Sequence, residues 1–171
     1  PAEYERVTSL VAQKFPHATR ILERERKALQ KRLAEAGMRN FSTTCRVKGL
    51  YSLYAKLTRK DWEIDRVYDV LAIRVILPNI EACYRTLGVI HEIWRPLPKR
   101  MKDYIAFPKP NGYRSLHSTV ATHSGIILEI QIRTARMHRE AEHGIASHLT
   151  YKDTQGVTPA PDQGNWFSRL V

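Results

Sequence analysis

Two isolated carboxylates, Asp69 and Glu129, lie in apolar, strand-like runs of a strongly basic sequence. The segments around them supply cationic side chains: Arg46, Lys48, Lys56, Arg74, Arg100 and Lys102. A polyphosphate carries enough negative charge to need such cations, and a hard divalent ion held by one or two carboxylates and by substrate phosphates would complete the site. Because phosphoryl-type transfer needs mainly positioning and charge neutralisation, these residues indicate an enzyme that handles polyphosphates.

The run that carries Glu129, residues 126–133, alternates between apolar and polar side chains. The apolar row is Leu128, Ile130 and Ile132, and the polar row is Glu129, Gln131 and Arg133. Successive side chains of a strand point to opposite faces, so we expect the apolar row to face a core and the polar row to be exposed. A solvated strand face is the plain alternative, and the cations nearby favour a functional face.

The preceding run, residues 113–123, is also β-rich, and Ser124-Gly125 separates it from the strand of Glu129. Two such runs joined by a short turn with glycine predict a β-hairpin. Tyr113 and His117 share one face of the first run. The Pro-Asn-Gly turn before Tyr113 is expected to hold its ring exposed.

Four residues around the start of a predicted helix, residues 50–59, could reach one anion: Arg46, Lys48, Ser52 and Lys56. Ser52 and Lys56 are four residues apart and share a face of that helix. The first backbone N–H groups of a helix also attract anions. The alternative is a set of solvated cations that have no common ligand.

Residues 69–77 are nearly all apolar, which predicts a central strand covered on both faces. Asp69 and Arg74 interrupt this run. A buried charge without a partner is costly, so we expect each of them at an edge or beside a ligand. Strict alternation places the two side chains on opposite faces. They can serve one site only if Asp69 lies at the mouth of the strand or a bulge redirects one side chain.

The remaining elements must position these groups. Helical patterns cover Ala2–Lys14 and residues 18–36, 50–59, 80–94 and 134–151, and strand patterns cover residues 38–47, 69–77, 113–123 and 126–133. This order predicts an α/β (α+β) fold in which helices flank a mixed β-sheet. We divide the chain into an N-terminal helical segment (1–37), a core (38–152) and a tail rich in Pro and Gly (153–171), which is expected to be loosely ordered.

The composition of the 171 residues, 43% hydrophobic and 26% charged, predicts a globular domain with a real core. The net charge of +11 favours polyanionic ligands such as nucleotides or nucleic acid. Cys45 and Cys83 are far apart and lack metal-binding spacing, so we expect free thiols. The sequence has neither a membrane-spanning apolar run nor a signal segment, and a cytoplasmic setting without membrane contact is expected.

Six collinear motifs between Arg46 and Asp153 resemble the (p)ppGpp synthetase domain of RelA/SpoT-type alarmone enzymes. They read RVKGLYSLYAKL, YDVLAIRVI, LGVIHEIWRPLP, RMKDYIAFPKPNGYRSLHSTV, LEIQIRTARMHREAEHGIASH and YKD. The collinear set is specific, although no single motif is. The resemblance implies a nucleotidyltransferase-like fold and transfer of the β,γ-pyrophosphate of ATP to the 3′-OH of GDP or GTP. The products would be AMP and the alarmone (p)ppGpp, which acts in the stringent response.

The resemblance also implies site residues, carried over by matching motifs. ATP would be bound by Arg46, Lys48, Ser52, Lys56 and Arg74. The guanine nucleotide would be bound by Lys102, Asn111, Tyr113 and His117. The two arginines would stack on adenine, and Tyr113 would stack on guanine. Asp69 and Glu129 would bind magnesium, with manganese as an alternative, while Glu129 would also accept the proton of the 3′-OH and Gln131 would orient the acceptor.

Some features limit what the resemblance implies. The family usually has Ala-His-Trp where this chain has Ser147-His148-Leu149, and a more polar residue where it has Gly49. No His-Asp dipeptide, the metal motif of the family's hydrolase domain, occurs, so hydrolysis of the product is not expected. Contact with the ribosome and tRNA is expected only through regions absent from this sequence, and the oligomeric state is not predicted.

Three other classes compete with this interpretation. An RNA-binding module would explain the charge and the aromatic residues, but unmetallated acids such as Asp69 and Glu129 would repel its phosphates. A non-catalytic nucleotide-binding regulatory module would keep the fold and lose a motif residue, and none is lost. A different nucleotidyltransferase would not need the motif on the guanine side. The pyrophosphate-transfer interpretation explains both the acids and that motif.

Overall fold

The computed structural model describes residues 2–153. The chain up to Ala141 belongs to one compact unit, and residues from Glu142 belong to a second. Of the predicted loosely ordered tail, residues 153–171, only Asp153 is described, and it ends the last helix. Within the described part of the chain, no helix combines the length and the apolarity that crossing a membrane requires.

The elements follow the predicted order. The helices are α1 (Ala2–Lys14), α2 (Ala18–Glu35), α3 (Leu50–Thr58), the short 3₁₀ helix η1 (Ile64–Arg66), α4 (Ile80–Ile93) and α5 (Ala135–Asp153). The strands are β1 (Ser42–Val47), β2 (Leu71–Leu77), β3 (Arg95–Pro96), β4 (Lys102–Asp103), β5 (Leu116–Ala121) and β6 (Ile127–Thr134). The prediction missed η1, β3 and β4, and it began β1, β2 and β5 too early.

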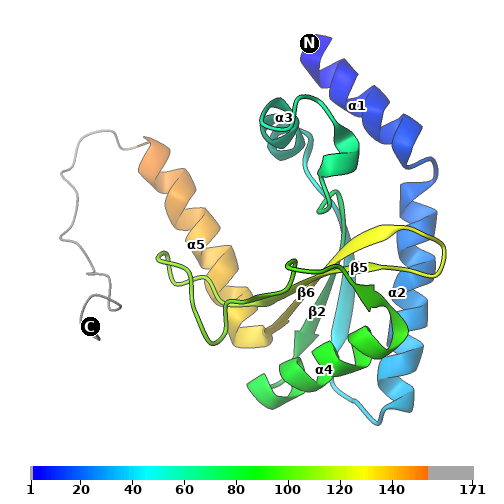
Figure 1. Cartoon of the computed structure of the whole chain (residues 1–171). Coiled ribbons are helices and arrows are strands. Elements are labelled where there is room, and N and C mark those ends of the chain that lie inside the picture. Colours follow the sequence, from blue (N-terminus) through cyan, green and yellow to red (C-terminus); the bar gives the residue numbers. More distant parts are fainter. Residues whose placement is uncertain (1, 154–171) are drawn as a thin grey trace. The chain divides into compact units, whose positions relative to one another are not determined.

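The strands form one mixed sheet in the order β1-β2-β6-β5-β3, with β4 paired to β5. β2 and β6 run parallel, whereas β1 pairs with β2 and β5 pairs with β6 in the antiparallel sense. Helices α2 and α4 pack against the sheet (Figure 1). The predicted mixed sheet flanked by helices is therefore confirmed, and so is the hairpin that turns at Ser124-Gly125.

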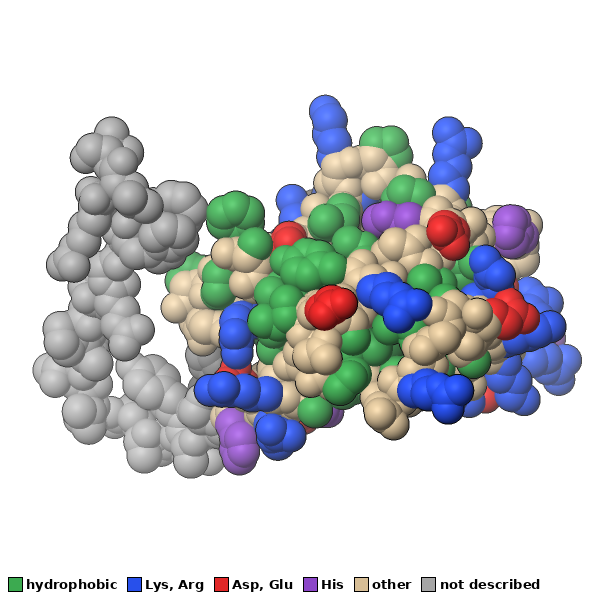
Figure 2. All heavy atoms as spheres, turned by 90° about the horizontal axis from the view of Figure 1, so that it is seen from below, with side chains coloured by type: hydrophobic (Ala, Val, Ile, Leu, Met, Phe, Trp, Pro, Cys, Tyr) green, Lys and Arg blue, Asp and Glu red, His purple; other side chains and the backbone are tan. Residues whose placement is uncertain are grey.

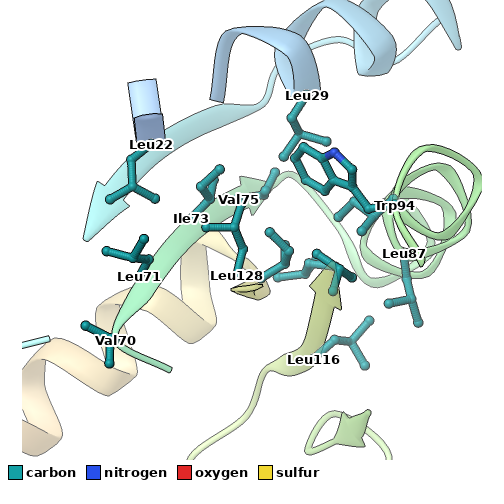
Figure 3. Close-up of a cluster of buried hydrophobic side chains, with 14 of the residues drawn as sticks. Leu22, Leu29, Val70, Leu71, Ile73, Val75, Leu87, Trp94, Leu116 and Leu128 are labelled. Atoms are coloured by element: carbon teal, nitrogen blue, oxygen red, sulfur yellow. The ribbon is translucent and has the colours of Figure 1, made fainter. Parts of the chain in front are cut away.

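The core lies between the sheet and helices α2 and α4. β2 turns Leu71, Ile73 and Val75 toward it, and all three side chains are fully buried. Figure 3 shows these residues converging with side chains of the helices and of the neighbouring strands: Leu22, Leu29, Leu87, Trp94, Leu116 and Leu128. Because side chains alternate along a strand, the residues between those of the core point to the opposite face of the sheet. That second face remains available for a ligand.

Local signals set the ends of several elements. Pro78 follows β2, and Asn79 caps α4 by accepting a hydrogen bond from the backbone N–H of Ala82 at 2.8 Å. Gly37, after α2, and Gly125, at the tip of the β5–β6 hairpin, both have a φ of 79°. Glycine adopts this left-handed backbone without the strain that a side chain would add, so these turns depend on it.

One expectation for β6 is wrong. The polar row of Glu129, Gln131 and Arg133 was expected to be exposed, but Arg133 is only 2% exposed and the other two are half-buried. A guanidinium nitrogen of Arg133 lies 2.9 Å from Nδ1 of His138 in the first turns of α5, and the Arg133 guanidinium lies 6.0 Å from the ring of Tyr113. Alternation therefore predicts the correct face for Arg133. The segment before β5 and the start of α5 cover this end of β6 and bury the side chain.

Candidate active site

A cleft of about 620 Å³ lies on the face of the sheet that turns away from the core. Its floor contains Ala72 of β2, Glu129 and Gln131 of β6, and His117 and Thr119 of β5. The register places these side chains on one face, because Ala72 pairs with Glu129 and His117 pairs with Gln131. Helix α3 and the loops before β2 and β4 supply the walls.

Most of the residues predicted for the site line this cleft: Arg46, Lys48, Ser52, Lys56, Asp69, Lys102, His117, Glu129 and Gln131. Three predicted residues, Arg74, Asn111 and Tyr113, are not part of the lining. Arg74 lies on the same face of the sheet, beside the lining, because its Nε and one terminal nitrogen are each 3.4 Å from Oε1 of Gln131. The structure thus brings together groups from five separate segments of the chain.

Asp69 lies in the turn before β2, so the alternation of the strand does not apply to it. Its Oδ2 accepts hydrogen bonds from Nζ of Lys48 at 2.9 Å and from Nζ of Lys56 at 2.5 Å. The buried side chains of Val67 and Val70 flank this turn and anchor it to the core. The position at the mouth of the strand resolves the expected conflict between Asp69 and Arg74, and no bulge is needed.

The two lysines determine the charge of Asp69. Burial alone would raise the pKa of this carboxyl, but the hydrogen bonds from Lys56 and Lys48 outweigh it and lower the pKa below its ordinary value of 3.8. Asp69 is therefore an anion at neutral pH. Since the folded-state pKa is depressed, the group stabilises the fold above its unfolded pKa, and this contribution is lost as the pH falls through the folded pKa.

This linkage predicts how acid affects stability. Between pH 5 and pH 3 the free energy of unfolding should fall less steeply in Asp69→Asn than in the parent, because asparagine does not titrate. Urea unfolding followed by circular dichroism at several pH values measures the difference. Asp61→Asn is the control, since Asp61 is an exposed surface acid. Parallel slopes in the parent and in Asp69→Asn would contradict the prediction.

Glu129 lies between His117 of β5 and Gln131 of β6 in a row of polar contacts across the sheet. Its Oε1 lies 3.0 Å from Nδ1 of His117 and accepts a hydrogen bond from Nε2 of Gln131 at 3.3 Å. Burial would raise the pKa of Glu129 and so would the charge of Asp69, but the contacts with His117 and Gln131 lower it overall. Glu129 is thus held as an oriented carboxylate that faces the same cleft as Asp69.

Tyr113 is less exposed than the sequence predicts. It precedes β5, its ring is half-buried, and its hydroxyl lies 2.8 Å from Nε2 of His117. Asn111 holds the turn before it, because its Oδ1 accepts the backbone N–H of Tyr113 at 3.0 Å. Lys109 lies over the same ring, with Nζ 5.2 Å from the centroid. The hydroxyl edge of Tyr113 is therefore tied to the site through His117, while the ring lies at its margin.

Arg46 and Arg74 are diagonal neighbours on the cleft face. In the antiparallel pairing of β1 and β2, Arg46 lies opposite Ala72, and Arg74 is two residues further along β2. The strand positions of diagonal neighbours are about 7–8 Å apart. Both long side chains therefore start from one part of the cleft face, and guanidinium groups can stack on a planar ring.

Sequence reasoning did not assign five further cations of the lining to the site: Arg59, Lys60, Arg66, Lys99 and Lys109. They come from the end of α3, from η1 and from loops, where no periodic pattern points them in one direction. Their only signal in the sequence is their charge. Arg100, also in the lining, stacks its guanidinium 4.5 Å from the centroid of the Tyr68 ring. Figure 2 shows that Lys and Arg side chains also spread over the face seen from below, with Asp and Glu side chains interspersed among them.

Comparison with known proteins gives consistent matches. A model of the region found in RelA and SpoT proteins matches residues 45–156. A probable guanosine-3′,5′-bis(diphosphate) 3′-pyrophosphohydrolase of Synechocystis is 40% identical over 176 residues, which cover 100% of this chain and 23% of that protein. A GTP pyrophosphokinase of Myxococcus xanthus is 40% identical over 144 residues, which cover 84% of this chain and 19% of that protein. The chain thus spans less than a quarter of the length of either relative.

Solved structures share the fold. The small alarmone synthetase 2 of Bacillus subtilis superposes with a TM-score of 0.69 at 28% identity, over 85% of this chain and 83% of that one. The small alarmone synthetase 1 of the same organism, bound to its product pppGpp, gives a TM-score of 0.67 at 24% identity, over 86% of this chain and 84% of that one. The family match covers more than half of the chain and includes both carboxylates of the cleft. This chain therefore belongs to the RelA/SpoT family.

Proposed function

We propose that this domain is a (p)ppGpp synthetase that transfers the β,γ-pyrophosphate of ATP to the 3′-OH of GDP or GTP in the cytoplasm. The observation that carries the proposal is the cleft in which two carboxylates from separate segments, Asp69 and Glu129, face a ring of cations. Such a site matches a polyphosphate substrate and separates a donor side from an acceptor side. The names of the relatives and the shared fold support the same activity.

The donor side is formed by β1, β2 and α3. Arg46 and Arg74 would hold adenine between their guanidinium planes, as their diagonal spacing allows. Lys48, Ser52 and Lys56 would bind the phosphates, with the backbone N–H groups at the start of α3 directed at the same anion. Bound in this way, ATP would have its β-phosphorus above the floor of the cleft.

The acceptor side is formed by β4, β5 and β6. The face of the Tyr113 ring would stack on guanine, while Lys102 and His117, which the β4–β5 pairing places opposite each other, and Asn111 would line the acceptor pocket. Gln131 would orient the ribose next to Glu129. The 3′-oxygen then attacks the β-phosphorus of ATP, its proton passes to Glu129, and the bond between the α,β-bridging oxygen and the β-phosphorus breaks to release AMP.

The residues present fit a divalent cation. The part of the chain that the structure describes has no cluster of three or more His, Cys, Asp or Glu that could hold a metal. It does have two carboxylates that face one cleft, which suits Mg²⁺, because this ion is usually held by one or two carboxylates together with substrate phosphates and water. Asp69 and Glu129 would hold Mg²⁺, with Mn²⁺ as an alternative, and the ion would neutralise charge on the transferring phosphates.

One assay tests the activity. The protein is incubated with ATP, magnesium and either GDP or GTP, and the products are separated by anion-exchange chromatography. We expect AMP and a 3′-pyrophosphorylated guanine nucleotide in equal amounts. Formation of ADP or of free pyrophosphate without that nucleotide would contradict the proposal.

The adenine clamp makes a separate prediction. Arg46→Lys or Arg74→Lys keeps the charge but removes the planar group that stacks on the base, so the KM for ATP should rise about 2- to 30-fold. The KM for GDP should change little. Arg39→Lys, in an exposed loop outside the cleft, is the matched control. Unchanged ATP affinity in both variants would mean that the charge alone matters.

A further inference from the structure

The carboxylate of Asp69 is paired with two lysines, Lys48 and Lys56. Asp69 is proposed to bind the divalent cation, whereas the lysines are proposed to bind the phosphates. One carboxylate oxygen, Oδ2, accepts both Nζ–H donors, from Lys48 at 2.9 Å and from Lys56 at 2.5 Å. The side chains of Asp69 and Lys48 are each 20% exposed, and that of Lys56 is 46% exposed. On the donor side of the cleft, one carboxylate is therefore already paired with two ammonium groups of the protein.

This arrangement weakens the binding of a divalent cation without polyphosphate, and of polyphosphate without a cation. A divalent cation that approaches Asp69 meets two ammonium groups beside the same oxygen, and like charges at such distances repel strongly. A polyphosphate that approaches Lys48 and Lys56 meets the carboxylate and must draw the lysines away from it. When both ligands arrive, the phosphates take the lysines and the cation takes Asp69, so no charge loses its partner.

We propose that the Lys48–Asp69–Lys56 cluster couples the binding of the divalent cation to the binding of polyphosphate, so that neither ligand binds well without the other. The inference rests on the proposed function, because it assigns the carboxylate to the cation and the lysines to the phosphates. Coupling between two ligands is reciprocal, so each must raise the affinity for the other by the same factor. The cluster thereby keeps the free metal out of an empty site.

The cluster makes two predictions that reverse the usual effect of removing a binding residue. Removing a phosphate-binding lysine should raise the affinity for free cation, because Asp69 loses a competing partner. Removing the metal-binding carboxylate should raise the affinity for metal-free polyphosphate, because both lysines are released. A hydrogen bond to a charged group, discounted for the exposure of Lys56, corresponds to a change of about three- to tenfold in either affinity.

The first experiment measures the binding of Mn²⁺ without nucleotide, by the loss of its free electron paramagnetic resonance signal. Lys56→Gln should bind Mn²⁺ about three- to tenfold more tightly than the parent. Lys60→Gln is the matched control, since Lys60 lines the same cleft but has no ion pair with Asp69 among the described contacts. Equal gains in Lys56→Gln and Lys60→Gln would show a general charge effect and overturn the coupling. Lys48→Gln repeats the test with the more buried lysine.

The second experiment measures the binding of tripolyphosphate in the presence of EDTA, by isothermal titration calorimetry. Asp69→Asn should bind it about three- to tenfold more tightly than the parent. Glu129→Gln removes the same charge from the same cleft but releases no lysine, because Glu129 contacts His117 and Gln131 instead. It should therefore gain less than Asp69→Asn. An equal gain in both variants, or none in Asp69→Asn, would overturn the inference.

Neither experiment needs turnover. If the synthetase assay fails but both affinities change as stated, the proposed reaction is wrong and the coupling stands. If pyrophosphate transfer is observed but the Lys56 and Asp69 variants match their controls, the reaction stands and the coupling is wrong.

Discussion

Replacing Glu129 with glutamine is expected to lower kcat by about 10²–10³-fold or more while the protein stays folded. The amide keeps the shape of the side chain and can still contact Gln131, but it can neither accept the proton of the 3′-OH nor hold a cation. Glu129 is largely enclosed and lies on the floor of the cleft. The other carboxylate among the described lining residues, that of Asp69, is held by Lys48 and Lys56 and should not replace it. Asp69→Asn should cause a loss of the same order.

Turnover is measured as AMP release under saturating ATP and GDP, with circular dichroism of each variant as the test of folding. Glu81→Gln is the matched control, because Glu81 is an exposed acid in the first turn of α4 on the other side of the sheet. It should retain the activity of the parent. A folded Glu129→Gln protein with near-normal kcat would refute the assignment of this carboxylate.

Replacing Tyr113 with alanine should weaken the guanine nucleotide about 5- to 150-fold, because base–aromatic stacking contributes about 1–3 kcal/mol. Tyr113→Phe should weaken it much less. The ring has two separable functions, since its face is proposed to stack on guanine and its hydroxyl contacts Nε2 of His117. Phenylalanine keeps the first and removes only the second.

Calorimetric titration with GDP measures these affinities, and titration with a non-hydrolysable ATP analogue serves as the control for the donor side. Tyr104→Ala is the comparison for a loss of packing alone, because Tyr104 packs edge-on against Tyr113 with 6.2 Å between ring centroids. If Tyr113→Ala lowered the melting temperature but left the affinity for GDP unchanged, the ring would have only a packing role.

Much of the fold follows from periodicity. The apolar and polar rows of β6, the near-continuous apolar run of β2 and the amphipathic helices are long patterns, and each gave an element of the correct type. Elements of two or three residues, such as β3, β4 and η1, are too short to show a period. Their positions depend on contacts with other elements, because β3 and β4 pair with β5 and η1 contacts α1.

The site was predicted less completely, for a physical reason. A sequence shows which face of a strand carries Arg133, but it does not show what covers that face, and contacts with His138 and Tyr113 bury it. The apolar run also included Asp69 in the strand, although pairing begins only at Leu71. Contacts such as those of Lys48 and Lys56 with Asp69 join residues that are 13 or more positions apart, and no local pattern encodes them.

The alternation along β6 determines where a residue can be inserted into the chain. One residue inserted between Leu128 and Glu129 would shift the rest of the strand to the other face. Glu129 would then point at helices α2 and α4, and Ile130 would enter the cleft. An insertion at Ser124-Gly125, in the exposed turn, leaves both rows in place. Insertions and deletions should therefore be excluded from β6 and tolerated in the turn four residues before Glu129, because a shift of one residue exchanges the cleft face of the strand with its core face.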